Sequence, residues 1–287
     1  MRHLLEGGSL TAEDLSAVLD AAALVDPPQV LSGKGAALLF EKPSNRTRVS
    51  MEMAVVQLGG HPISLRGEEV GMGTREPAAD VARVLSSYCG LIGARVFAHE
   101  MLHQMADAAS VPVVNLLSDD AHPCQALADL LTLRQHFGGL DGLVLAYVGD
   151  GNNVCRSLMA MVDQAGITMR VASPPGYEPP AHAGIAVTND PVEAVSGADA
   201  VCTDVWASMG REEEAARRRR DFAGFTVDEA MMAKASPEAV FLHCLPAHRG
   251  EEVAASVVDG PRSLVWQEAA NRLPAQRGAI LWLLESA

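Results

Sequence analysis

Glu41-Lys42-Pro43-Ser44-Asn45-Arg46-Thr47-Arg48, at residues 41–48, is the stretch that decides how this chain folds. The apolar residues 36–40 come directly before it and predict a buried strand. Pro43 and Ser44 are typical helix-start residues, with Ser44 as the expected N-cap. A buried strand that passes through a short polar loop into a helix is typical of α/β proteins. Apolar residues of the predicted helix fall on or near one face, namely Val49, Met53, Val56 and Leu58.

The same stretch places polar and basic side chains at the start of the predicted helix. Unpaired backbone N–H groups and the positive end of the helix dipole favour anions at that position. Two arginines, a serine and a threonine there predict a site for a phosphate-like dianion. Taken alone, the stretch also fits a capped helix with solvated arginines, and the rest of the chain decides between the two.

Apolar runs alternate with helical stretches along the chain. Most of the runs are continuous, as in parallel strands that are covered on both faces. The predicted fold class is therefore α/β, with two domains that each hold an open, mostly parallel sheet flanked by helices. The strand order stays open. The predicted strands are residues 36–40, 91–97, 111–116, 143–149, 169–172, 200–205, 240–245 and 263–266.

The length of 287 residues suits two domains rather than one small core. Glycine-rich residues 137–142 follow a predicted helix at 125–136 and mark the boundary. We therefore predict a first domain at 1–137 and a second at 138–266. The last helix, about 267–287, is expected to pack back on the first domain, with the active site in the cleft between the domains.

Composition excludes several classes of protein. Hydrophobic residues make up 48% of the chain, yet no apolar run approaches the roughly 18 residues of a membrane span. Glu6 comes early and no apolar segment follows the first residues, so no signal peptide is expected. The five cysteines are odd in number and scattered, without a Cys-x-x-Cys pair. They predict reduced thiols in a cytoplasm, with neither a disulfide framework nor a metal site.

The formal net charge of −14 argues against general affinity for nucleic acid. The run Arg217-Arg218-Arg219-Arg220 is the apparent exception. Glu213 and Glu214 stand four residues before Arg217 and Arg218, which is the favourable spacing for ion pairs on a helix. We interpret this run as a charged, solvent-facing helix or loop rather than a nucleic-acid patch.

Polar clusters follow four of the predicted strands, where open α/β sheets bind their ligands. Each cluster has an ordinary explanation when taken singly. His122 fits a structural helix-entry residue, Gly149-x-Gly151 is half of a dinucleotide-binding motif, and Cys244 fits an inert thiol. Asp204 and Ser208 fit turn and cap residues. The clusters are residues 118–125, 149–154, 204–210 and 243–246.

Together these clusters resemble the aspartate/ornithine carbamoyltransferase family over nearly the whole chain. Residues 44–48 are similar to its Ser-x-Arg-Thr-Arg loop for carbamoyl phosphate, and residues 122–125 to its His-Pro-x-Gln. Arg95, His243-Cys244-Leu245-Pro246 and Asn271-Arg272 stand where the family has further signatures. Asp204-Val205-Trp206-Ala207-Ser208-Met209-Gly210 is similar to the Asp-x-Trp-x-Ser-Met-Gly loop of the members that act on ornithine.

The resemblance implies an enzyme that transfers the carbamoyl group of carbamoyl phosphate to the δ-amine of L-ornithine, giving L-citrulline and phosphate. Because an acyl phosphate carries a good leaving group, no covalent enzyme intermediate is needed. The residues implied in carbamoyl phosphate binding are Ser44, Asn45, Arg46, Thr47, Arg95, His122, Gln125, Cys244, Leu245 and Arg272. Those implied in catalysis are Arg46, Thr47, Arg95, His122, Cys244 and Arg272. Those implied in ornithine binding are Asn153, Asp204, Ser208 and Met209.

The resemblance further implies a cytoplasmic enzyme of arginine biosynthesis, a homotrimer or a multiple of it, without cofactor, nucleic-acid partner or membrane partner. Gly71, Ala270 and Pro274 depart from the family pattern at positions that others fill with glutamine, glutamate and histidine. Two alternatives stay open: a carbamoyltransferase for a related amine or amino acid, and a non-catalytic relative that retains the pocket.

Overall fold

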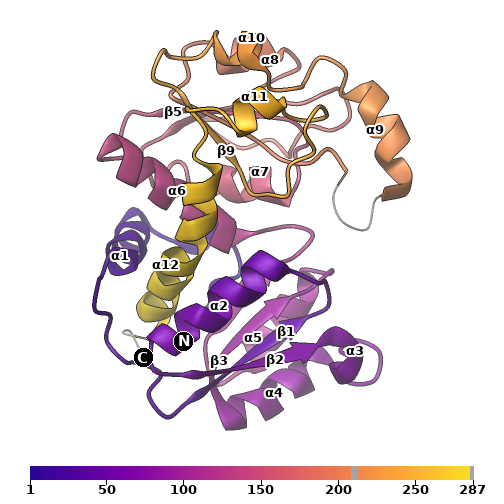
Figure 1. Cartoon of the computed structure of the whole chain (residues 1–287). Coiled ribbons are helices and arrows are strands. Elements are labelled where there is room, and N and C mark those ends of the chain that lie inside the picture. The colour runs from indigo at the N-terminus through magenta and orange to yellow at the C-terminus, as the bar shows by residue number, and fades with distance from the viewer. Residues whose placement is uncertain (208–211, 285–287) are drawn as a thin grey trace. The chain divides into compact units, whose positions relative to one another are not determined.

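The computed structural model describes residues 1–207 and 212–284, and the chain divides into two compact units (Figure 1). Unit 1 consists of Met1–Ala128 and the chain from Ala270 onward, and unit 2 is Asp129–Ala269. The first crossing falls inside helix α6 (Pro123–Phe137), whereas the sequence analysis placed the boundary after residue 137. The second crossing falls inside helix α12 (Val265–Leu284). Both connections between the units are therefore helical.

Unit 1 is built on a four-stranded sheet in the order β2-β1-β3-β4, and every pairing in it is parallel. The central strand β1 is buried at its four interior positions, which is why its sequence is a continuous apolar run. Helices α2 and α4 lie on opposite faces of this sheet (Figure 1). The elements are η1 (Gly7–Ser9), α1 (Ala12–Ala22), β1 (Gly35–Phe40), α2 (Asn45–Gln57), β2 (His61–Arg66), α3 (Gly67–Val70), α4 (Ala78–Tyr88), β3 (Cys89–Arg95), α5 (Glu100–Ala108) and β4 (Val113–Leu117).

Unit 2 is built on a five-stranded sheet in the order β7-β6-β5-β8-β9, again with parallel pairing throughout. Its core gathers apolar side chains around four buried aromatic rings, those of Trp206, Phe222, Phe225 and Phe241. The elements are β5 (Val144–Val148), α7 (Asn153–Met159), β6 (Thr168–Ala172), β7 (Ala186–Thr188), α8 (Pro191–Val195), β8 (Ala200–Thr203), η2 (Glu212–Glu214), α9 (Ala215–Asp221), α10 (Glu229–Met232), β9 (Val240–His243) and α11 (Ala255–Val258).

The two parallel sheets confirm the predicted α/β fold class. Within residues 1–207 and 212–284, every helix is too short or too polar to span a bilayer.

Within unit 1, the later part of α12 packs closely on α1. The indole Nε1 of Trp282 donates to Asp14 Oδ1 at 2.9 Å, and a guanidinium nitrogen of Arg277 donates to the carbonyl of Ala22 at 2.9 Å. A Cβ atom added at Gly278 would lie 2.3 Å from the carbonyl oxygen of Val18. Only glycine allows the two backbones to approach this closely.

Three strand predictions need correction. Strands β2 and β7 were missed, and each is an edge strand with exposed positions. Residues 263–266 were predicted as a strand, but Val265 already begins α12, and only a single bridge joins Ser263 to Phe241. A short apolar run fits the edge of a sheet and the first turn of a helix equally well.

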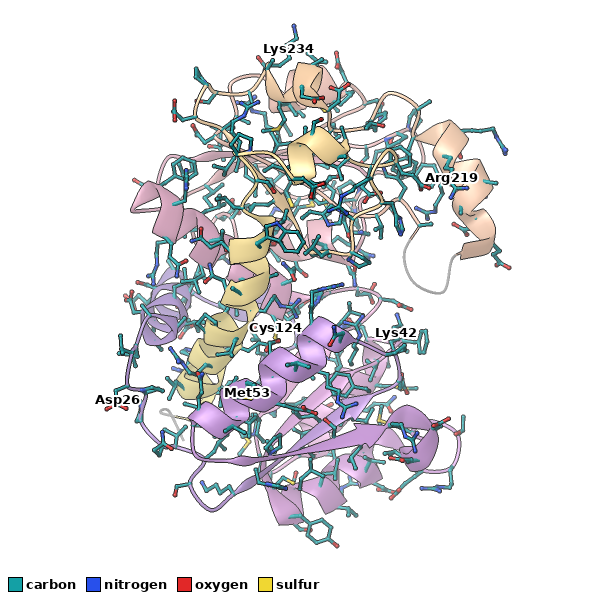
Figure 2. All side chains as sticks on the ribbon, viewed as in Figure 1. Asp26, Lys42, Met53, Cys124, Arg219 and Lys234 are labelled. Carbon is teal, nitrogen blue, oxygen red and sulfur yellow. The ribbon has the colours of Figure 1, made fainter. Side chains whose placement is uncertain are left out.

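The apolar face predicted for α2 is wrong at three of its four residues, and only Leu58, just after the helix, is buried. Val49, Met53 and Val56 are exposed, and Met53 is marked on this helix in Figure 2. The helix instead buries Met51, Ala54 and Val55. The apolar residues of α2 therefore occupy two sides of the helix, and the sequence alone did not distinguish them.

The arginine run at residues 217–220 lies entirely in α9, which ends at Asp221. Arg217, Arg219 and Arg220 are exposed, as expected, whereas Arg218 is only 3% exposed. The interpretation of the run as wholly solvent-facing is therefore wrong at Arg218.

Candidate active site

In unit 1, the two central strands deliver polar residues to the same edge of the sheet. Strand β1 runs into residues 41–48, and β3 ends at Arg95. The backbone N–H of Glu41 donates to the carbonyl of Arg95 at 2.9 Å, which fastens the two strand ends together. The strand order changes direction between β1 and β3. Open α/β sheets bind ligands beyond such a switch point.

The start of α2 forms one wall of this edge. Ser44 is the N-cap, and its hydroxyl accepts from the backbone N–H of Thr47 at 3.2 Å. The predicted cap is therefore confirmed. Asn45 and Arg46 occupy the first turn, where backbone N–H groups point out of the helix. The positive end of a 13-residue helix thus faces the edge where β1 ends.

Two buried arginines converge on Thr47. A guanidinium nitrogen of Arg272 donates to Thr47 Oγ1 at 3.0 Å, and one of Arg95 lies 3.5 Å from the same oxygen. Arg272 also donates to Gln125 Oε1 at 2.6 Å. All four side chains are buried. Two guanidinium groups and a helix N-terminus therefore concentrate positive charge around one hydroxyl, as an anionic ligand requires.

His122 completes the group and stays uncharged beside it. It stands immediately before α6 and is buried. Burial lowers the pKa of His122 well below 6.5, and the cations of Arg272 and Arg95 lower it further. A positive charge on the imidazole would lack solvation and would be repelled by both arginines. His122 is therefore a neutral ring, able to donate one hydrogen bond to a polar ligand atom.

In unit 2, the strand order reverses between β5 and β8, and the loops after these strands meet at a carboxylate. The amide Nδ2 of Asn152 donates to Asp204 Oδ2 at 2.7 Å. Asn152 is also the N-cap of α7, since its Oδ1 accepts from the backbone N–H groups of Val154 and Cys155. The thiol of Cys244, just after β9, donates to Asp204 Oδ1 at 3.1 Å. Both oxygens of Asp204 are thereby oriented.

The thiol of Cys244 is a poor nucleophile in this setting. Desolvation raises the pKa of Cys244 well above 9.0, and the neighbouring Asp204 carboxylate raises it further. The thiolate is the reactive form of cysteine, so a raised pKa argues against covalent chemistry. The geometry favours a thiol that orients Asp204 or a ligand nearby.

His243 holds the backbone around Cys244. Its Nδ1 accepts from the backbone N–H of Leu245 at 2.9 Å, and its Nε2 lies 3.1 Å from Glu252 Oε1. The first contact assigns the proton to Nε2, which then donates to the carboxylate. The backbone N–H of His243 donates to Glu268 Oε2 at 2.8 Å. Leu245 adopts a φ of 57°, a strained value for a branched residue that this network maintains.

The structure therefore brings together Thr47, Arg95, His122, Gln125 and Arg272 in unit 1, beside the Ser44 cap. In unit 2 it brings together Asp204 and Cys244. Ser208 and Met209 lie outside the described residues.

Two residues of these edges were missed by the sequence analysis. Asn152, not its neighbour Asn153, bonds to Asp204, and its place directly before a helix was the available signal. The ammonium group of Lys42 is buried, pairs with Asp119 and lies 4.3 Å from the centre of the Phe97 ring. Lys42 thereby ties the loop after β1 to the loop after β4. No pattern around Lys42 distinguished it from a surface lysine.

Potential metal ligands gather at two places in the described part of the chain. Ligand atoms of Asp204, His243 and Cys244 lie within 4.8 Å of one another, as do those of His248, Glu251 and Glu252. In the first group, both ring nitrogens of His243 are already engaged by protein atoms. In the second, Glu251 is paired with Arg219. The contacts within the protein account for both arrangements.

Two family models match the chain in succession. The carbamoyl-P binding domain of aspartate/ornithine carbamoyltransferase matches residues 2–135. The Asp/Orn binding domain of aspartate/ornithine carbamoyltransferase matches residues 141–284.

Individual relatives and solved structures agree with these matches. Ornithine carbamoyltransferase of Acidothermus cellulolyticus is 49% identical and covers 100% of this chain and 98% of its own length. That of Thermus thermophilus is 50% identical, with 99% and 97% coverage. The structure of ornithine carbamoyltransferase from Pyrococcus furiosus superposes with a TM-score of 0.94 at 43% identity and covers 100% of this chain and 98% of that one.

Proposed function

This chain belongs to the aspartate/ornithine carbamoyltransferase family, and from that premise we propose how its side chains carry out the family's reaction. The protein is a carbamoyltransferase that moves the carbamoyl group of carbamoyl phosphate to the δ-amine of L-ornithine, giving L-citrulline and phosphate. One observation carries the residue assignments: Arg95 and Arg272 converge, buried, on Thr47 at the start of α2.

The phosphate of carbamoyl phosphate is assigned to the first turn of α2. The backbone N–H groups after Ser44, together with the Arg46 guanidinium, offer several donors to a dianion. Asn45 would contribute through its backbone. The helix dipole adds attraction that a flexible loop would lack.

The carbonyl oxygen of the carbamoyl group is assigned to Thr47, Arg95 and His122. Negative charge develops on this oxygen as the amine attacks, and fixed cations stabilise such charge in a water-poor site. Because the lowered pKa of His122 keeps the ring neutral, the arginines supply the charge and His122 supplies a directed hydrogen bond. Gln125, held by Arg272, is assigned to the carbamoyl amide group. The roles predicted there for Cys244 and Leu245 stay predictions.

Ornithine is assigned to unit 2, where Asp204 is proposed to bind its α-ammonium group. Asn152 and Cys244 hold the two carboxylate oxygens, so Asp204 presents a fixed direction to the ligand. The roles predicted for Asn153, Ser208 and Met209 stay predictions. The neutral δ-amine attacks the carbonyl carbon, the C–O bond to phosphate breaks, and the departing phosphate accepts the proton of the amine.

An assay with a panel of amines tests the function. The purified protein is incubated with carbamoyl phosphate and, in separate reactions, with L-ornithine, putrescine, N-acetyl-L-ornithine or L-aspartate. Phosphate release and the carbamoylated product are both measured. Of the four amines, only L-ornithine is expected to be carbamoylated efficiently. A preference for another amine would favour the related-transferase alternative, and carbamoyl phosphate binding without turnover on any amine would favour the non-catalytic one.

The wider setting is part of the same proposal. We infer a cytoplasmic homotrimer that serves arginine biosynthesis. The five cysteines support the location, since all of them are unpaired thiols, as expected in a reducing compartment. Sedimentation of the purified protein tests the trimer.

A further inference from the structure

Arg218 is the buried member of an otherwise exposed arginine run on α9. Figure 2 marks its neighbour Arg219 on the same helix, and Arg219 is exposed. The side chain of Arg218 is 3% exposed, and its guanidinium lies 4.9 Å from the centre of the Tyr177 ring. Burying a cation is costly unless every donor finds a partner. Such a position therefore calls for an explanation in terms of what the cation binds.

The partners of Arg218 come from two loops and from Glu214, the residue that precedes its own helix. One terminal nitrogen, Nη1, donates to Asp150 Oδ2 at 2.6 Å and to the backbone carbonyl of Trp206 at 2.7 Å. Its Nε donates to Glu214 Oε2 at 2.9 Å. Burial alone would lower the pKa of Arg218, but the carboxylates of Glu214 and Asp150 raise it. The group is therefore a permanent cation at the junction.

The two loops that Arg218 joins are the ones that meet at Asp204. Asp150 stands two residues before Asn152, in the loop after β5, and Trp206 stands two residues after Asp204, in the loop after β8. Asn152 and Asp204 are themselves joined by a 2.7 Å hydrogen bond. Arg218 thus forms a second connection between the same two loops, in addition to the hydrogen bond between Asn152 and Asp204.

Other contacts also hold both of these loops against neighbouring parts of unit 2. The ring of Trp206 packs against Phe222, at the end of α9, with 5.4 Å between the ring centres. The backbone N–H of Gly151 donates to the carbonyl of Tyr177 at 2.8 Å. A Cβ atom at Gly151 would lie 2.2 Å from the backbone nitrogen of Pro179, so only glycine allows this close approach of the two segments. These contacts anchor each loop separately, whereas Arg218 joins the two loops to each other through a buried cation.

We propose that Arg218 is a positioning residue for the amino-acid substrate, which holds the Asn152–Asp204 pair in place by tying the Asp150 loop to the Trp206 loop. The proposal rests on the assignment of ornithine to Asp204 and adds a residue that need not touch ornithine. It predicts a specific defect in ornithine use, because the contacts of Arg218 described above all lie in unit 2.

The test compares Arg218→Met with Arg220→Met, which removes the same charge from an exposed position of the same run. For Arg218→Met, the KM for ornithine should rise by about tenfold or more, equivalent to about 1.4 kcal/mol or more of lost binding, while the KM for carbamoyl phosphate stays within about twofold. Arg218→Lys should be intermediate, because one ammonium group cannot reproduce the planar fork of donors. Arg220→Met should match the wild type in both constants.

A second measurement needs no substrate. Cys244 bonds to Asp204, so release of Asp204 should expose the thiol. Alkylation of Cys244 by iodoacetamide, followed by peptide mass spectrometry, should become several-fold faster in Arg218→Met and stay unchanged in Arg220→Met. If the wild type failed to carbamoylate ornithine, the proposed function would fall, while this comparison would still test Arg218.

Two results would overturn the role of Arg218. One is an ornithine KM and a Cys244 alkylation rate in folded Arg218→Met that both equal those of the wild type. The other is an equal rise in both substrate constants, which indicates general loss of structure. If Arg218→Met does not fold, Arg218→Lys and Asp150→Asn replace it. Asp150→Asn keeps the shape but removes the anionic partner, and a normal ornithine KM in both variants would again refute the proposal.

Discussion

His122 lies beside the guanidinium groups of Arg272 and Arg95, and its protonation follows from that neighbourhood. A histidine on a protein surface changes charge near neutral pH. Here burial and two cations lower the pKa of His122 well below 6.5, so the ring stays neutral while the arginines stay charged. The residues of this site therefore have different roles: the arginines carry positive charge, and His122 offers a directed hydrogen bond without a charge.

The first prediction concerns stability in acid. The unfolded chain takes up a proton on His122 near pH 6.5, whereas the folded chain does not. Below that pH this group should lower the free energy of unfolding by up to about 1.4 kcal/mol per pH unit. Stability from His122 is thus fully present above pH 6.5 and is lost as the pH falls. Urea denaturation of ligand-free wild type and His122→Asn at pH 7.5 and 5.5 measures it, and parallel losses in the two proteins would contradict it.

The second prediction concerns Cys244. Because its pKa is raised by burial and by Asp204, iodoacetamide should alkylate Cys244 slowly at neutral pH, and the rate should still be climbing above pH 9. Cys244→Ser keeps a hydrogen-bond donor at the same place, so it should lower turnover without abolishing it. Mass spectrometry of the enzyme quenched during turnover checks the chemistry. A carbamoyl group trapped on Cys244 would show that the direct attack by ornithine is wrong.

Among the strands, those that are mostly buried were predicted from the sequence, including the edge strands β4 and β9, and the two without a buried position, β2 and β7, were not. Strand β1 reads as a continuous apolar run because both of its faces are covered. The edge strand β2 has no buried position, and its sequence mixes polar and apolar residues. In the site, the cap at Ser44 depends on residues next to it in the sequence and was predicted. The partners of Arg218 lie on other loops and were not predicted. Nothing within a run of four arginines shows which one faces inward.

Helix caps give the third prediction, at the scale of elements. Ser44→Ala removes the cap of α2 and Thr11→Ala removes the cap of α1, and both helices lie in unit 1. Each change should cost about 1 kcal/mol of stability. Only Ser44→Ala should also raise the KM for carbamoyl phosphate, by about fivefold or more, because only α2 begins at the anion site. Thermal unfolding and initial-rate kinetics on both variants decide the matter. If the two variants had equal KM values for carbamoyl phosphate, the assignment of the phosphate to the start of α2 would be wrong.

For the molecule as a whole, the two units are proposed to take one substrate each. Unit 1 gathers the cationic side chains around Thr47, and unit 2 gathers the polar contacts around Asp204. An anionic acyl phosphate is bound by cationic side chains, and a cationic amino acid by anionic ones. The two substrates are thus assigned to different sheets, one with cationic and one with anionic side chains.

The fourth prediction follows from this separation. Arg46→Ala should weaken carbamoyl phosphate binding by at least about a hundredfold, about 2.7 kcal/mol, because a charged donor to a dianion is lost. Asp204→Asn should raise the ornithine KM and lower turnover while carbamoyl phosphate binding changes by less than about twofold. Calorimetry with carbamoyl phosphate, together with steady-state kinetics in ornithine, measures both. A folded variant that loses both affinities to the same extent would refute the division.

The discontinuity of unit 1 also has a consequence for how the protein is made. Arg272 reaches Thr47 across 225 positions of sequence, and all of unit 2 lies between the two stretches that form unit 1. A ribosome releases the chain from its N-terminus, and domains generally fold as units during synthesis. Unit 2 therefore has all of its residues available before Ala270, where the unit 1 part of α12 begins, emerges. A nascent chain interrupted before that point holds the start of α2 without Arg272 and without the packing of α12 on α1. The cationic cluster around Thr47 is therefore completed among the last parts of the chain to be synthesised.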